Sequence, residues 1–395
     1  SGMMSGWVSG QYKSDNTHIN LERLCQFAGA RFIRGEVTGL DLEQQRILLL
    51  DRPSIRYDLL SLNVGSTSPS TFKSAFSIKP IAEFEKNLEL LDQTVRGNQT
   101  LSIVGSGAAG LEMSFALKTR YQDKLRINLV GQELLSGISP RATQRILNKM
   151  KLKRISFIEG YATEFRDQTL SFRNRPSIET DYVVEATGAA SYAWIKDSDL
   201  SVDDMGFVKV DRYLKSVSHS TVFAVGDVAS LEGQERPKSG VFAVREGKNL
   251  VHNLVAALYK KQLKPYRAQR NYLSLINCCD GTAIAVRGGF VSLGKIWWRY
   301  KNAIDKKFVS RFNDLEFMPG SEQSLPDEFS HEVSLETMRC NGCGAKLPAD
   351  PLRRVLERLD IYKSDVIELG VGDDAARIVT ASGKMLLTID GFRAL

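Results

Sequence analysis

Short runs of apolar residues, separated by polar turns, predict buried strands along the first two thirds of the chain. Leu101–Val104 leads through a glycine turn into an apolar helical pattern that ends near Leu117, and Arg126–Val130 is a second apolar run. A third run, 182–186, ends in Thr187-Gly188. Apolar strands without alternation are typical of parallel sheets covered on both faces. The pattern therefore predicts a β-α-β arrangement.

The flanking sequence predicts further elements of the same kind. We expect helices over Leu21–Ala28 and from about Gly240 to Tyr259, and strands over Arg31–Ile33, Arg46–Leu50, Tyr57–Asn63 and 222–227. The stretch 318–329 is rich in proline, serine and acidic residues, which is typical of a linker. Beyond it, an amphipathic helix is expected over Pro351–Leu359.

Length and composition exclude several classes of protein. The chain has 395 residues, of which 43% are apolar and 25% charged, so two to three ordinary globular domains are expected. No apolar run reaches the roughly 18 residues of a membrane span, and no signal peptide is visible at the N-terminus. Five cysteines, an odd number, fit a reducing compartment better than a disulfide framework. We therefore expect a cytoplasmic protein.

The net charge of +7 is concentrated in one segment, residues 294–312, which has six cationic residues and one acidic residue. The remainder is nearly neutral, so a general nucleic-acid surface is not expected. Apolar residues recur in this segment at helical spacing and share one face: Trp297, Tyr300, Ile304, Phe308 and Phe312. Such a helix could contact a membrane peripherally, or dock on its own sheet with a solvated basic rim.

The turn after the 101–104 strand has the pattern G-x-G-x-x-G. Gly105 would form the tight turn, Gly107 would let backbone N–H groups approach a pyrophosphate, and Gly110 would let helix and strand pack closely. The positive end of the following helix favours phosphate. The turn therefore predicts dinucleotide binding, with a ligand-free glycine-rich turn as the alternative.

The acidic residue that would bind the ribose hydroxyl is not at its usual position in the sequence. A carboxylate at the end of the next strand would accept a hydrogen bond from a 2′-hydroxyl, and an arginine would favour a 2′-phosphate. Here the strand is followed by Gly131 and Gln132, and the first acidic residue, Glu133, lies one residue beyond the expected position. The choice between NADH and NADPH stays open at this point.

Four ordered motifs resemble a known family: 57–66, 105–110, 185–188 and 222–227. Together they are similar to the two-dinucleotide-domain flavoproteins, and most of all to type II NADH dehydrogenase-like oxidoreductases. The resemblance implies FAD at Gly65, Ser66, Gly226 and Asp227, and NAD(P)H at Gly105, Gly107, Gly110, Thr187 and Gly188. It also implies hydride transfer from nicotinamide to flavin, which needs no protein acid or base. From the residues alone, Asp227 could instead cap a helix.

Two features depart from this family. Its first strand-GxGxxG-helix unit, for the FAD diphosphate, has no counterpart before Leu21, so we expect the chain to begin part-way into the FAD domain. A redox C-x-x-x-x-C pair is also missing, because Cys25 is alone and Cys278 and Cys279 are adjacent. Disulfide-reductase chemistry is therefore not expected.

The C-terminal residues 339–395 resemble the beginning of selenophosphate synthetase (selenide, water dikinase), which uses ATP and Mg²⁺. The matching motifs contain Cys343, Lys346, Asp374 and Asp390. The resemblance implies that Cys343 and Lys346 are catalytic and that Asp374 and Asp390 lie near the metal and nucleotide. A thiol near an ammonium favours thiolate, and aspartates suit Mg²⁺. Half a zinc site at 340–343 and a plain turn at 372–374 are the alternatives.

The sequence thus predicts an α/β, two-dinucleotide-binding-domain flavoprotein with an inserted NAD(P) domain, followed by the start of a PurM-like α+β domain. The expected divisions are a partial FAD domain, the NAD(P) domain, the second FAD segment, a basic-helix segment, a linker and the synthetase-like part: 1–97, 98–205, 206–262, 263–318, 319–338 and 339–395.

The predicted function is an FAD-dependent NAD(P)H oxidoreductase fused to an ATP- and Mg²⁺-dependent selenide, water dikinase, with the second activity incomplete in this fragment. The expected partners are a small-molecule electron acceptor, either a quinone or a selenium or sulfur species, and a second copy of the full-length chain. The alternatives are a membrane-associated NADH:quinone oxidoreductase and a non-catalytic dinucleotide-binding module.

Overall fold

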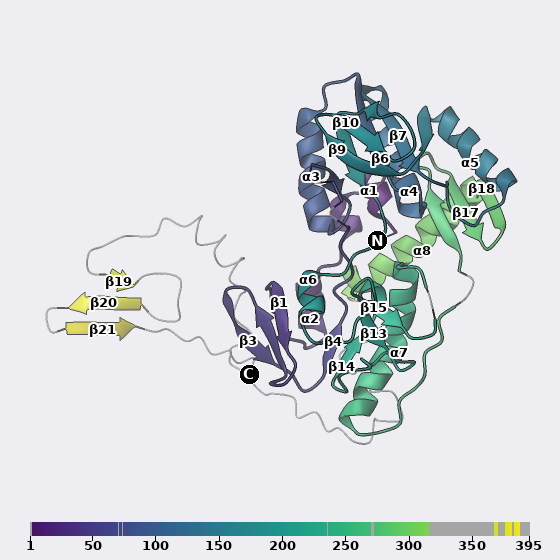
Figure 1. Cartoon of the computed structure of the whole chain (residues 1–395). Coiled ribbons are helices and arrows are strands. Elements are labelled where there is room, and N and C mark those ends of the chain that lie inside the picture. The colour runs from purple at the N-terminus through teal and green to yellow at the C-terminus, as the bar shows by residue number, and fades with distance from the viewer. Residues whose placement is uncertain are drawn as a thin grey trace. The chain divides into compact units, whose positions relative to one another are not determined.

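The computed structural model describes residues 2–69, 71–72, 74–234, 236–269 and 272–315, together with the backbone of three strands near the C-terminus (Figure 1). By its internal contacts the chain divides into two units, residues 1–326 and 327–395. In the second unit the described strands form an antiparallel sheet, β19 (Ile367–Leu369), β20 (Ala376–Thr380) and β21 (Gly383–Leu387).

A five-stranded parallel sheet is the centre of the first unit, and its order is β5-β12-β6-β7-β8. The strands are β5 (Phe76–Ser77), β6 (Gln99–Val104), β7 (Leu125–Gly131), β8 (Ile155–Glu159) and β12 (Tyr182–Glu185). The parallel sheet predicted from the apolar runs is confirmed. Because every strand runs the same way, the turns after β6, β7, β8 and β12 all lie at one edge.

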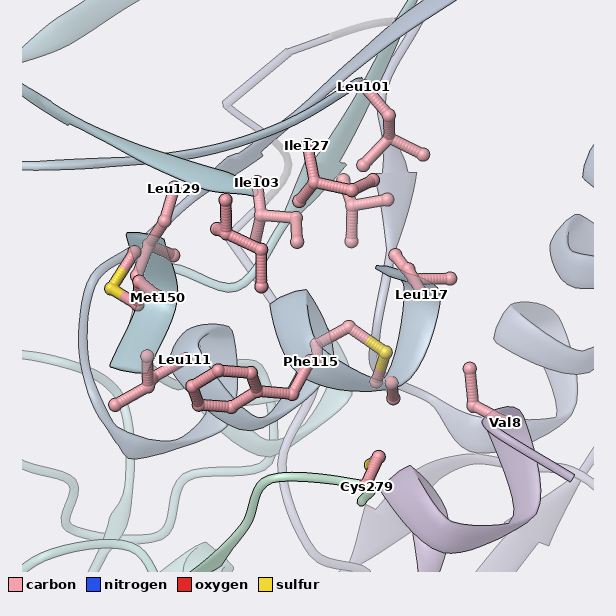
Figure 2. Close-up of a cluster of buried hydrophobic side chains, with 14 of the residues drawn as sticks. Val8, Leu101, Ile103, Leu111, Phe115, Leu117, Ile127, Leu129, Met150 and Cys279 are labelled. Atoms are coloured by element: carbon pink, nitrogen blue, oxygen red, sulfur yellow. The ribbon is translucent and has the colours of Figure 1, made fainter. Parts of the chain in front are cut away.

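Helices cover one face of this sheet: α1 (Met4–Val8), α3 (Ile81–Thr94), α4 (Ala108–Tyr121) and α5 (Pro140–Leu152). Side chains alternate along β6, so Leu101 and Ile103 face these helices while Ser102 and Val104 face the opposite side. Figure 2 shows this core, in which Leu111, Phe115 and Leu117 of α4 meet the strand residues Leu101, Ile103, Ile127 and Leu129.

A second sheet, not helices, covers the opposite face. It is antiparallel, in the order β11-β10-β9, with the strands β9 (Ala162–Arg166), β10 (Thr169–Phe172) and β11 (Ile178–Glu179). Leu170 and Phe172 of β10 pack against Val104, Val130 and Val183. Both faces of the parallel sheet are therefore buried, as an unbroken apolar strand requires.

The rest of the first unit is built from segments on either side of this sheet in the sequence. β4 (Leu60–Leu62) pairs in parallel with β14 (Val222–Ala224), although 160 residues separate them. The other elements are β1 (Val37–Asp41), β2 (Arg46–Leu49), β3 (Arg52–Arg56), β13 (Val208–Val210), β15 (Ala229–Leu231), α2 (Leu21–Phe27), α6 (Ala193–Lys196) and α7 (Gly240–Leu258). The five-stranded region is thus inserted between two halves of another core.

An antiparallel sheet and a long helix complete the first unit: β16 (Ser274–Asn277), β17 (Ala283–Arg287), β18 (Phe290–Gly294) and α8 (Lys295–Asn313). The Lys301 ammonium of α8 is buried, donating to the Gly2 carbonyl and to Asp305 Oδ2 (2.7 Å), 4.0 Å from Glu112 Oε1. Burial raises the pKa of Glu112, and Lys301 opposes that shift. α8 is therefore docked through a buried cation.

Three sequence expectations need correction. Arg31–Ile33 form no strand, because they lie exposed and pair with no strand among the described residues. The strand expected over 57–63 is only β4, since Tyr57–Leu59 lead into it as a turn. Lys301 does not belong to a solvated basic rim, because its ammonium is buried between Gly2, Glu112 of α4 and Asp305 of α8.

Several expectations lie outside the described residues. These are the linker 319–338, the helix 351–359, and the site residues Cys343, Lys346, Asp374 and Asp390. Within the part of the chain that the structure describes, no helix combines the length and the apolarity that crossing a membrane demands.

Replacing Phe115 by alanine tests the core of the parallel sheet. The Phe115 side chain is 1% exposed, so Phe115→Ala should lower the free energy of unfolding by about 3–5 kcal/mol. Chemical denaturation measures the loss. Leu152→Ala, at a side chain that is 82% exposed, is the control and should change stability by less than about 0.5 kcal/mol. Equal losses in the two variants would contradict this assignment of the core.

Candidate functional site

The turn between β6 and α4 has the geometry that its three glycines predict. Gly105 has φ +119°, and a Cβ there would overlap the carbonyl of Ala186. A Cβ on Gly110 would overlap the carbonyl oxygen of Gly105, so only glycine lets α4 pack this closely. Around Gly107, the N-cap of α4, a Cβ would meet nothing within 4 Å. The turn is therefore tight at its ends and open at its middle.

The neighbouring strand end is fastened to this turn. Ser106 Oγ donates to the carbonyl of Glu133 (2.5 Å), and Leu135 N–H donates to the carbonyl of Ser106 (3.1 Å). A Cβ on Gly131, the last residue of β7, would overlap Ser106 Oγ. The strand end beside the turn is therefore closed to any side chain.

The end of β12 lies against the same turn. The carbonyl of Ala186 is the atom that crowds Gly105, and the next residue, Thr187, donates its hydroxyl to the buried carboxylate of Glu185 (2.8 Å). Two residues beyond Gly188, Ala190 exchanges both backbone hydrogen bonds with Thr67 (2.9 and 2.8 Å). The 187–190 segment therefore joins the glycine turn to the 65–67 segment.

Asp227 lies next to that 65–67 segment in a small polar cluster. Its Oδ2 accepts hydrogen bonds from Ser66 Oγ (3.0 Å) and from Lys79 Nζ (2.9 Å), and Lys79 Nζ also donates to Ser66 Oγ (2.9 Å). The carboxylate side chain is only 16% exposed. Asp227 sits inside a short 3₁₀ turn, Gly226–Val228, that is capped by Val225, so the helix-cap alternative for Asp227 is wrong.

A buried ion pair holds the peptide of Gly226 just before Asp227. Glu246 of α7 accepts from Gly226 N–H (2.6 Å), and Arg236 Nη2 donates to the Gly226 carbonyl (3.1 Å). Arg236 Nη2 and Glu246 Oε1 lie 2.8 Å apart, with side chains 3% and 0% exposed. Gly226 itself has φ +71°, and a Cβ would come within 2.8 Å of Asn63 Oδ1. Both the N–H and the carbonyl of Gly226 are therefore held by hydrogen bonds.

Lys238 provides a further cation close to this pair. Its ammonium donates to the Ala229 carbonyl (2.8 Å) and lies 3.6 Å from the centre of the Phe207 ring. Burial, together with the nearby Arg236 guanidinium, lowers the pKa of Lys238 to about 8. The ammonium is thus more readily deprotonated than that of an ordinary surface lysine.

Backbone contacts and the side-chain hydrogen bond from Ser66 to Asp227 connect all four sequence motifs into one strip. It runs from the Gly105–Gly110 turn through Thr187-Gly188 and Gly65-Ser66 to Gly226-Asp227, and we name it the motif strip. Three of its supporting residues, Lys79, Glu246 and Arg236, are not predicted by the sequence. The sequence contained one indication of a role for Glu246, because this charged residue lies on the otherwise largely apolar buried face of α7.

Two of the described cysteines, Cys278 and Cys279, are buried in the apolar core. They pack beside α4, and burial raises the pKa of each thiol to about 12, so neither is a thiolate at neutral pH. In the described ranges no group of three His, Cys, Asp or Glu side chains is placed to hold a metal ion.

The same alanine substitution at two glycines of the turn should have different effects. Gly110→Ala forces a Cβ into the Gly105 carbonyl and should destabilise the protein by about 1–3 kcal/mol in denaturant unfolding. Gly107→Ala meets no protein atom, so its stability should match the parent. Its added methyl group would occupy the space a phosphate needs, so dinucleotide affinity by calorimetry should fall about tenfold. Unchanged affinity in Gly107→Ala would contradict phosphate binding there.

Comparison with known proteins finds relatives that match more than half of the chain. Ferroptosis suppressor protein 1 of Homo sapiens is 26% identical over 250 residues, which cover 60% of this chain and 66% of that protein. Demethylphylloquinone reductase NdbB of Synechocystis is 25% identical over 289 residues, covering 66% of this chain and 70% of that protein. The match thus spans just under two thirds of the human relative.

Solved structures share the same architecture. The sulfide:quinone oxidoreductase of Aquifex aeolicus superposes with a TM-score of 0.65 at 15% identity, over 84% of this chain and 86% of that one. The sequence model of the Pyridine nucleotide-disulphide oxidoreductase family matches residues 13–247, more than half of the chain. The chain therefore belongs to the pyridine nucleotide-disulphide oxidoreductase family.

Proposed function

We propose that the first unit is an FAD-dependent NAD(P)H oxidoreductase that passes hydride from nicotinamide to flavin. The observation that carries this proposal is the motif strip, in which two glycine-containing turns far apart in sequence are joined by backbone contacts and by the Ser66–Asp227 hydrogen bond. A hydride donor and its acceptor must lie within contact distance, so their binding sites have to be continuous.

The nicotinamide dinucleotide would bind at Gly105, Gly107 and Gly110, with Thr187 and Gly188 beside its nicotinamide half. The open space at Gly107 lies at the N-terminus of the 14-residue helix α4, whose first N–H groups have no helical partner. Such a terminus binds phosphate well. The glycines therefore bring the backbone, rather than a side chain, to the diphosphate.

The residues at the other end of the motif strip fit FAD, which supplies a ring that accepts hydride when bound. Both contacts to Asp227 use Oδ2, so among the described residues Oδ1 accepts no hydrogen bond and is available to a ligand hydroxyl. Ser66 and Lys79 fix the orientation of that carboxylate, and Gly65, with φ +74°, keeps the adjoining backbone bare. The Glu246–Arg236 pair holds Gly226 in position.

The electron acceptor that we propose is a small quinone, with a selenium or sulfur species as the alternative. The quinone is favoured because one relative is named a demethylphylloquinone reductase and one structural neighbour a sulfide:quinone oxidoreductase. Cys278 and Cys279 are buried in the apolar core, so neither is placed to reduce a disulfide substrate.

We also propose that α8 contacts an anionic membrane surface, where a quinone would dissolve. Apolar side chains remain exposed along one side of it: Ile296 at 72%, Tyr300 at 52%, Ile304 at 46% and Phe308 at 36%. Exposed cations accompany them, namely Lys295, Arg299, Lys306, Lys307 and Arg311. An apolar stripe with flanking cations is the pattern of a helix that lies on anionic lipid.

For residues 339–395 we propose the start of a selenide, water dikinase. Its support is the sequence alone, through Cys343, Lys346, Asp374 and Asp390, all outside the described residues. In this proposal the two activities share one polypeptide, which raises the effective concentration of a reduced selenium intermediate.

Intact protein should then make more selenophosphate from NAD(P)H, ATP, Mg²⁺ and an oxidised selenium donor than its separated halves.

Asp227→Asn tests the flavin site in the purified full-length protein. Loss of the charged acceptor should weaken FAD binding about ten- to a hundredfold, measured as flavin absorbance retained after gel filtration. Asp204→Asn, at an exposed aspartate with no described hydrogen bond, is the control and should retain its flavin. Anaerobic NADH or NADPH should bleach the parent protein. A colourless parent that still binds dinucleotide would favour the non-catalytic module instead.

Ile304→Asp tests the membrane contact of α8. The parent should co-sediment with anionic vesicles, and less so at high salt, because part of the attraction is electrostatic. A charge in place of this apolar side chain should lower vesicle affinity more than about tenfold. Val251→Asp, at a 55% exposed position on α7, is the matched control. If the parent stayed in the supernatant at both salt concentrations, α8 would be only a docked helix.

A further inference from the structure

In dinucleotide-binding folds, a carboxylate at the end of the second strand binds the 2′-hydroxyl of the adenosine ribose. The corresponding strand here is β7, and it does not end in a carboxylate. β7 ends at Gly131, where a Cβ would overlap Ser106 Oγ, and Ser106 is itself held by the Glu133 carbonyl. An aspartate or glutamate at 131 would therefore displace the glycine turn. A carboxylate at this place would repel a 2′-phosphate, so its absence from position 131 removes that repulsion.

The next strand end lies directly beside it. Gly131 is paired with Glu159, the last residue of β8, and Gly160 N–H donates to the Gly131 carbonyl (3.1 Å). Neighbouring strands lie about 4.8 Å apart, so groups at the end of β8 are within reach of a ribose placed over Gly131. Tyr161, which follows, has an exposed ring.

Two arginines from the segment after β10 lie over this second strand end. Arg175 Nη1 donates to the Glu159 carbonyl (2.8 Å), and its guanidinium lies 5.0 Å from the centre of the Phe172 ring. The Arg173 guanidinium lies 4.6 Å from the centre of the Tyr161 ring. Both side chains are exposed, and neither forms an ion pair with a described residue. Two cations are thus oriented by stacking without being neutralised.

We infer that Arg173 and Arg175 bind the 2′-phosphate of NADPH and make this chain select NADPH over NADH. The inference rests on the proposed function, because it assumes that the diphosphate of the dinucleotide lies at Gly107. A guanidinium offers several N–H donors in a fixed plane and matches phosphate geometry. Of these donors, Arg175 uses only Nη1 among the described contacts, which leaves the others for a ligand.

Glu133 is the group that could support the opposite preference. It is exposed and lies two residues beyond Gly131, and its backbone carbonyl is already bound to Ser106. A carboxylate that reached the ribose from there would accept a 2′-hydroxyl and favour NADH. The experiment must therefore compare both dinucleotides.

Dissociation constants of the full-length protein for NADPH, NADH and adenosine 2′,5′-bisphosphate, by calorimetry, test the inference. The parent should bind NADPH at least about tenfold more tightly than NADH. Arg173→Gln and Arg175→Gln together should weaken NADPH and the bisphosphate about ten- to a hundredfold and leave NADH unchanged. Arg166→Gln, at an exposed arginine on β9, is the control and should change neither. The NADPH preference should also fall with added salt.

The outcomes separate this inference from the proposal on which it rests. Tighter binding of NADH, or an equal loss of both dinucleotides in the double variant, would overturn the role of the two arginines while leaving dinucleotide binding intact. Binding of NADH in the variant at parental strength shows that the variant is folded. No binding of either dinucleotide to the parent would overturn the proposed function itself.

Discussion

The backbone of the turn at Gly105 lies directly against the backbone of Ala186, and the whole site depends on this contact. It exists because neither Gly105 nor Gly110 has a Cβ, which allows β6, α4 and the end of β12 to meet without side chains between them. The glycine turn and the end of β12 therefore lie side by side at one sheet edge, with the N-terminus of α4 directly after the turn. A diphosphate needs many N–H donors converging at short range, and side chains would hold the ligand away from them.

A second constraint acts at the other end of the motif strip. Gly226 is held from both sides by Glu246 and Arg236, a pair that is almost fully buried. Such a pair contributes little net stability against an apolar replacement, but losing one member leaves an uncompensated charge. Here the pair determines geometry, because it holds Gly226 and therefore sets the position of the next residue, Asp227. Lys79 and Ser66 then fix the carboxylate itself.

The sequence predicted the fold well where signals are local. The unbroken apolar runs at β6, β7 and β12 are sufficient for a parallel sheet, and the glycine turn follows from residue size at Gly105 and Gly110. The strand expected over Arg31–Ile33 is absent because apolar content alone does not supply a pairing partner. Arg236 lies just before α7 and has no local signal for its pairing with Glu246, and Lys79 meets Asp227 only through long-range folding, so neither could be predicted. The burial of Lys301 could not be predicted either, because it depends on contacts with Gly2 and Glu112, which are distant in sequence.

Hydrogen–deuterium exchange of the full-length protein, with and without saturating dinucleotide, tests the central claim most directly. If backbone amides at the glycine turn hold the diphosphate, peptides covering residues 105–111 should exchange more slowly when the dinucleotide is present, while those covering α2 should not change. Binding that leaves exchange at 105–111 unaltered, or that slows it only elsewhere, would contradict the account.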